Sequence, residues 1–252
     1  MTVSTGITGA VYGGGFASKK GWVKVTSTNV EVTAGKVDRV LGGGWAQTGG
    51  TSEVGSANIA VSGTADVGFI YGGGGADAEG SSVTGNVTIT VEGNATVDYI
   101  FMGGKYRNSV VGGTVDVTWA SESTETVTRI TGKNGNGEDL TTGTTTLTVN
   151  SNLNVSYLDN FDKLVIGEGV KISDLLDTEF DNLQIEFALD GELDTEWTVF
   201  AGNGLDSFAS ATFGIVGVEG TYNFGDAIGS TGYKLDFNED RKEIKMVKIA
   251  NA

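Results

Sequence analysis

Residues 83–104 read VTGNVTITVEGNATVDYIFMGG, and this stretch contains the unit that decides the fold. Val87, Ile89 and Val91 alternate with polar residues, which is the period-two pattern of a strand with one buried face. A short polar turn follows, then a second apolar segment that ends near Ile100, then glycines. The unit therefore predicts two strands joined by a turn and ended by a glycine-rich corner.

This unit recurs along the chain at a nearly constant spacing. The aliphatic residue before each corner steps by 29, 30 and 30 positions through Val11, Val40, Ile70 and Ile100. Two further aliphatic columns share the period: Val37, Val67, Val97 and Val127, and upstream Val25, Val54, Val83 and Val111. Such a period is typical of a solenoid in which each repeat forms one coil.

We expect the coils to stack into a parallel β-helix. One coil cannot bury its apolar face alone, whereas stacked coils, roughly 4.8 Å apart, pair each strand with the coils above and below. Parallel crossovers are right-handed in about 98% of cases. The sequence therefore predicts an all-β, right-handed parallel β-helix with coils of about 30 residues and a C-terminal β cap.

The glycines after each aliphatic residue indicate a structural corner. A positive φ or a close approach of stacked backbones would exclude a Cβ atom at this point. A phosphate-binding loop would instead require a helix to begin after the glycines, and no helical periodicity follows them.

We divide the chain into three parts. Residues 1–160 are expected to form about five coils, a weaker fifth copy being marked by Val155 and Leu158. Residues 161–190 are expected to continue the stack with shorter coils, and residues 191–252 to form a β-rich cap.

Two patterns indicate how the chain continues and closes after the long coils. The stretch from Phe161 to Ile166 is echoed by the stretch from Phe180 to Ile185, a shift of 19. The alternating side chains of residues 233–237 and 244–246 indicate an antiparallel hairpin that covers the open end of the stack.

The composition excludes several kinds of function. Asp and Glu total 32 against 16 Lys and Arg, and the net charge of −16 repels phosphate backbones, so no nucleic-acid partner is expected. Cysteine and histidine are absent, so disulfides, thiol nucleophiles and imidazole-based triads or zinc sites are excluded. Proline is also absent, which leaves the backbone amides available for continuous ladders.

The sequence contains no apolar run of about 18 residues, so we predict no membrane insertion by this segment. The first residues, 1–6, lack the basic and apolar regions of a signal peptide. We interpret the chain as a piece of a longer exported protein rather than as a cytosolic protein, and expect it to be monomeric or part of that longer chain.

The units VTGNVTITVEGNATVDYIFMGG and VYGGG resemble the repeats of large bacterial surface proteins of the adhesin-like and autotransporter-passenger type. The ending, from FDKLVIGEGV to YKLDFNEDRKEIKMVKI, is similar to the last coils and cap of a passenger. The resemblance covers most of the chain and specifies architecture better than activity. It implies a non-catalytic structural or adhesive module, without a cofactor, outside the cell or on a bacterial surface.

Catalysis is the main alternative, because β-helices also carry polysaccharide lyases and hydrolases. Asp38 and Asp98 share a column, but Gly68 lies between them. Two coil spacings, roughly 10 Å, would separate the acids, at or beyond the range of inverting glycosidases. We therefore predict no catalytic residues and keep a carbohydrate-active enzyme as the alternative function.

A calcium site is a second possibility to weigh. Residues 72–77 match the start of the calcium-binding nonapeptide G-G-x-G-x-D. The match occurs once, and Glu79 stands where an apolar residue is required. We therefore predict no metal site.

The best candidate binding residues are aromatic. Tyr12, Leu41, Tyr71 and Phe101 occur once per coil before the glycines, and Phe16, Trp45 and Tyr106 follow shortly after them. Aromatic rings at coil spacing can form a platform for sugar rings or a protein partner, or a ladder that only stiffens the stack. We take as candidate binding residues Tyr12, Trp45, Tyr71, Phe101 and Tyr106, with host or environmental glycans or proteins as partners.

Overall fold

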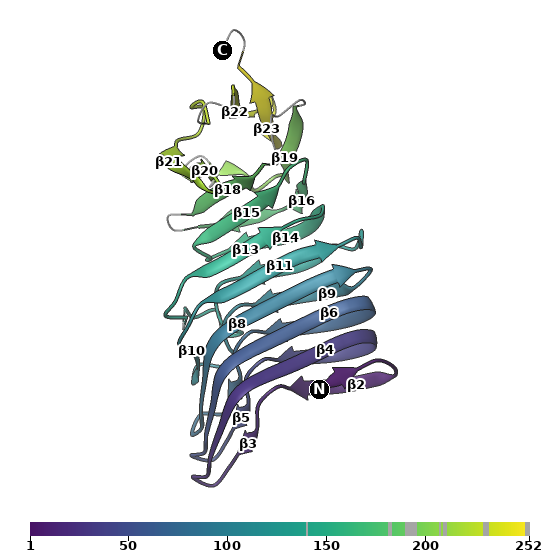
Figure 1. Cartoon of the computed structure of the whole chain (residues 1–252), viewed down its shortest axis with the longest axis vertical. Helices are drawn as coiled ribbons and strands as arrows, with labels where there is room; N and C mark the ends of the chain where they lie inside the picture. Colours follow the sequence, from purple (N-terminus) through teal and green to yellow (C-terminus); the bar gives the residue numbers. More distant parts are fainter. Residues whose placement is uncertain are drawn as a thin grey trace.

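The computed structural model describes residues 1–139, 141–180, 183–189, 196–206, 208, 211–228 and 232–249, without the side chains of residues 7, 8 and 219. The protein is a parallel β-solenoid of about seven turns, with equivalent positions about 29 residues apart (Figure 1). The predicted all-β parallel solenoid is confirmed.

Each long coil has two main strand segments that lie on two faces of the solenoid. In the second and third coils one continuous strand covers both faces: β4 (Trp22–Leu41) and β6 (Thr51–Tyr71). In the next coil the faces belong to β8 (Ser81–Gly93) and β9 (Thr96–Phe101). The remaining stacked strands are β1 (Thr2–Val3), β2 (Ile7–Tyr12), β10 (Ser109–Val111), β11 (Val115–Ser121), β12 (Val127–Thr131), β13 (Thr145–Val149), β14 (Leu153–Asp159), β15 (Lys163–Gly167), β16 (Ile172–Leu175), β17 (Asp177–Glu179) and β18 (Gln184–Ala188).

The core consists of aliphatic columns along the solenoid axis. Val37 pairs with Val67, which pairs with Val97, as the period predicts. A second buried column runs through Val11, Val40, Ile70, Ile100, Ile130 and Leu158. The two main predicted columns and the weak fifth copy are therefore confirmed.

The upstream column is wrong at one position. Val54 pairs with Thr84, not with Val83, which pairs with Glu53 instead. Val83 is 39% exposed whereas Thr84 is fully buried. The spacing between these coils is 30 residues here, as it is between Ile59 and Ile89. The predicted step of 29 residues therefore placed Val83 in the column instead of Thr84, and the side chain of Val83 points to the opposite face of the strand.

The glycine corners are close backbone contacts. A Cβ atom on Gly42 would lie 2.4 Å from the carbonyl oxygen of Gly72, and one on Gly72 would lie 2.4 Å from that of Met102. Neither glycine has a left-handed φ. Of the two reasons for a glycine at the corner, close stacking of successive coils is therefore the one that applies.

Beyond each corner the chain runs outward and returns, and these segments stack into a thin wing. We call residues 13–28, 42–56 and 72–86 the wing. It contains a small parallel sheet of β3 (Phe16–Ala17), β5 (Trp45–Ala46) and β7 (Gly75–Ala76), opposite the extended parts of the long strands (Figure 1). A Cβ atom on Gly44 would lie 2.1 Å from Ser52 Oγ, so only glycine lets the two layers approach this closely.

The shorter coils follow, but their predicted register changes along the chain. Leu153 pairs with Ile172, a shift of 19 that agrees with the echoed sequence. Leu164 pairs with Ile185, a shift of 21, so the echo is out of register on this face. The shift is already 20 between Tyr157 and Asp177, which pair between β14 and β17. The register is therefore displaced by one residue on β17 and by two on β18, where Leu164 and Ile185 are both buried.

Antiparallel strands close the C-terminal end. In the described residues these pairs are β19 (Trp197–Gly202) with β23 (Glu243–Lys248), β20 (Thr212–Ile215) with β21 (Val218–Tyr222), and β22 (Tyr233–Phe237) with β23. On their other edges β19 and β20 continue the parallel stack from β16 and β18. The predicted hairpin is confirmed, because Leu235 pairs with Met246 and Phe237 with Ile244. The predicted boundary at residues 190–191 lies outside the described residues. Among the described residues, no helix is long and apolar enough to cross a membrane.

Candidate functional site

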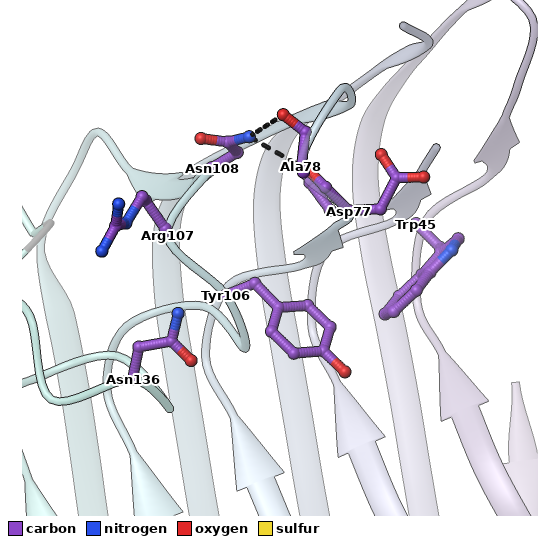
Figure 2. A pocket seen from close by; sticks show the side chains of 8 residues that line it. Trp45, Asp77, Ala78, Tyr106, Arg107, Asn108 and Asn136 are labelled. Carbon is purple, nitrogen blue, oxygen red and sulfur yellow. Dashed lines mark hydrogen bonds between the residues drawn. The ribbon is translucent and has the colours of Figure 1, made fainter. Parts of the chain in front are cut away.

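Aromatic rings line the junction between the wing and the second face of the solenoid, which is the face that carries β2, β9 and β12. Trp45, on β5, contacts Tyr12 of β2 and Tyr106 of the loop after β9. Each ring centroid lies 5.7 Å from that of Trp45, with interplanar angles of 69° and 73°. Figure 2 shows the side chains of Trp45 and Tyr106 beside the same cavity, and their segments are two coils apart with β7 between them. We call Tyr12, Phe16, Trp45 and Tyr106 the aromatic groove.

Gly75 makes room for the indole of Trp45. The backbone pairs Phe16 with Trp45 and Trp45 with Gly75, so these residues form one column. A Cβ atom on Gly75 would lie 2.4 Å from Cε3 and Cζ3 of Trp45 and 3.3 Å from Cδ2 of Leu41. The indole therefore lies over the Gly75 backbone, where any other residue would place a side chain.

Two cavities flank Trp45. The smaller, of about 200 Å³, is lined by Tyr12, Gly14, Gly15, Phe16 and Trp45. The larger, of about 560 Å³, is lined by Trp45, Ala76, Asp77, Ala78, Tyr106, Arg107, Asn108 and Asn136 (Figure 2). A ligand that stacks on Trp45 can therefore extend into a cavity on either side.

Polar groups surround the larger cavity. The Asn108 side chain donates from Nδ2 to the carbonyl oxygens of Asp77 and Ala78, both at 3.0 Å (Figure 2). Lys105 Nζ lies 5.6 Å from the Trp45 ring centroid and 4.8 Å from that of Tyr106. Within the described part of the chain Lys105 has no carboxylate partner. Its ammonium group therefore stays available to a ligand beside the two rings.

The Asp77 carboxylate holds the wing turns together. It accepts hydrogen bonds from the backbone amides of Thr48 (3.0 Å), Glu79 (3.0 Å) and Gly80 (2.8 Å). Desolvation raises the pKa of Asp77, but the three amides together outweigh it and lower the pKa below its ordinary value. The aspartate of the nonapeptide match therefore joins two successive coils through their backbone amides.

We expect the Asp77 turn to loosen in acid. Because the folded-state pKa is lowered, the stabilisation is present above the unfolded-state pKa and is lost as the pH falls through the folded-state value. Carboxyl-carbon NMR titration should give a midpoint below that of an Asp in an unfolded peptide. The protection factor of the Gly80 amide, in which the intrinsic pH dependence of exchange is removed, should fall over the same pH range. Asp77→Ala, which removes the acceptor, should show the low protection factor already at neutral pH. A midpoint at or above the peptide value would contradict this assignment.

Tyr71 and Phe101 belong to a different cluster. Their rings stack 5.1 Å apart at 10°, beside Phe69 and Tyr99, which stack 4.8 Å apart at 10°. Tyr71 is only 7% exposed, and burial raises the pKa of its hydroxyl, although the Arg39 charge opposes the shift. The nearly parallel rings form an internal ladder along the axis. The five candidate residues therefore separate, with Tyr12, Trp45 and Tyr106 in the groove and Tyr71 and Phe101 in the ladder.

Some members of these clusters were not predicted from the sequence. Phe69 and Tyr99 were detectable, because each lies two residues before a ladder residue and so shares its strand face. Lys105 and Asn108 carry no comparable signal, since they lie in the irregular loop between β9 and β10, whose path the periodicity does not determine.

The column of acids considered for catalysis lies outside the groove. Asp38 forms an ion pair with Arg39. Gly68 of the intervening coil separates Asp38 from Asp98. Burial, and then the charge of Asp66, raise the pKa of Asp98. In the residues that the structure describes, no three Asp, Glu, His or Cys side chains are grouped so that they could hold a metal ion.

Comparison of the chain with protein-family models, with curated proteins and with solved structures finds no match.

Proposed function

We propose that the chain is a non-catalytic, structural or adhesive module of a bacterial surface protein, and that it contacts glycans through the aromatic groove. The observation that carries this proposal is the position of Trp45, which lies between two cavities with a ring on each side of it. Aromatic faces bind the apolar faces of sugar rings, while polar groups at the rim can bind hydroxyls.

The scaffold supports such a role because the groove residues are fixed before a ligand arrives. Tyr12 and Trp45 lie on strands of the stack, and Asn108 ties the Tyr106 loop to the neighbouring wing turn. A preformed site loses little conformational entropy on binding, so more of the contact energy remains as affinity.

The proposed location outside the cell or on its surface is supported by the sequence. The repeats resemble those of adhesin-like and passenger proteins, and a stiff stack without proline suits a projecting module. The net charge of −16 keeps such a module soluble. Adhesin or passenger identity is part of this proposal.

The test is a glycan array with the parent protein and Trp45→Ala. We expect the variant to lose binding by about tenfold or more, because it removes the ring between the two cavities. Trp22→Ala is the matched control, since Trp22 is 63% exposed and lines neither cavity. It should bind like the parent, and both variants should still unfold cooperatively.

Three outcomes would contradict the proposal. A parent protein that binds no glycan on the array removes the support for a glycan-contact role. Release of new reducing ends from a bound glycan would favour the carbohydrate-active enzyme instead. Equal loss of binding in Trp22→Ala and Trp45→Ala would show that the groove is not the contact site.

A further inference from the structure

We infer that the aromatic groove takes an extended, neutral glycan chain of at least three sugar residues that lies along the solenoid axis. This inference rests on the proposed function and adds the direction, length and charge of the ligand. It is carried by the coil register of the groove, the two cavities and the charges beside them.

The groove runs along the axis because its residues come from successive coils. Trp45 N donates to Gly15 O at 3.0 Å, Gly75 N to Gly44 O at 2.9 Å, and Lys105 N to Gly74 O at 2.8 Å. Phe16, Trp45, Gly75 and Lys105 therefore occupy equivalent positions in four neighbouring coils. Three coil spacings of roughly 4.8 Å give the groove a length of about 14 Å.

The spacing of the coils matches an extended saccharide. The rise of one coil is close to the length of one pyranose residue in an equatorially linked chain. A chain along the axis therefore meets equivalent positions at each residue, whereas a chain across the axis would leave the groove after one residue. A single sugar on Trp45 would also leave the cavities of about 200 Å³ and about 560 Å³ largely unfilled.

Charges of both signs lie beside the groove. The Lys105 ammonium group lies beside the two rings, and Asp77 and Arg107 line the larger cavity, where Arg107 Nε pairs with Glu138 at 3.1 Å. The whole chain carries a net charge of −16, which repels a polyanion. A neutral, hydroxyl-rich chain complements this arrangement, because it can accept from Lys105 and bind the side chain of Asn136, which lines the same cavity (Figure 2).

The experiment measures affinity against chain length by titration calorimetry. The probes are neutral β-1,4-linked glucose and N-acetylglucosamine oligosaccharides, from mono- to tetrasaccharide, with oligogalacturonates of the same lengths as acidic counterparts. We expect the neutral trisaccharide to bind about tenfold tighter than the monosaccharide, and the acidic chains to bind more weakly than neutral chains of equal length.

Two variants test the direction of the chain. Phe16→Ala and Tyr106→Ala remove rings at opposite ends of the groove and leave Trp45 in place. Each should reduce the gain from chain length while changing monosaccharide affinity little, and Trp22→Ala should change neither. Tighter binding of the acidic chains, no gain with length, or no binding of any neutral chain overturns the inference. A positive glycan array together with any of these results leaves the proposed function standing.

Discussion

Replacing Trp119 by alanine is expected to lower the free energy of unfolding by about 3–5 kcal/mol. Trp119 is 1% exposed and pairs with Val91 on one side and Val149 on the other. Its Nε1 donates to the carbonyl oxygen of Asn152 at 3.3 Å. The variant would leave a cavity between neighbouring coils and remove the hydrogen bond to Asn152, and both effects are destabilising.

Urea unfolding followed by circular dichroism measures this loss. Because each coil contacts mainly its neighbours, hydrogen exchange should accelerate first in β8, β11 and β13. Thr118→Ala is the matched control on the same strand, since Thr118 is partly exposed on the opposite face. A loss below about 1 kcal/mol for Trp119→Ala would show that the surrounding coils collapse into the space.

The second large effect is expected for Gly74→Ala, with a loss of about 3 kcal/mol. The new Cβ atom would lie 2.1 Å from Ser82 Oγ and 2.3 Å from the carbonyl oxygen of Gly44. The serine side chain can rotate, but the Gly44 backbone belongs to the paired wing and cannot move without separating coils. Because Gly44 precedes Trp45, the same displacement should also weaken glycan binding.

Gly112→Ala is the control for this substitution. The nearest atom to its added Cβ would be Thr84 O at 3.8 Å, an ordinary contact, and its φ is not left-handed. We expect its free energy of unfolding to lie within about 0.5 kcal/mol of that of the parent. If the two glycine variants were equally stable, the close approach of the wing layers would not limit the fold.

The prediction of the main columns succeeded because a solenoid repeats its local environment. Val37, Val67 and Val97 occupy the same position in successive coils, so one period describes both sequence and packing. The prediction failed at Val83, where a one-residue error in spacing changes the strand face. It also missed the register on β18, because turn length between strands is not determined by the apolar pattern.

The sequence by itself determined the parallel stack, the glycine corners and the C-terminal hairpin, because each depends on residues within one repeat or one pair of strands. Only the tertiary structure decided which aromatic residues meet. Trp45 and Tyr106 are separated by two corners, and their contact depends on how far the wing folds back toward the second face. That distance is set by close contacts of glycines such as Gly44 with neighbouring coils, which sequence periodicity does not encode.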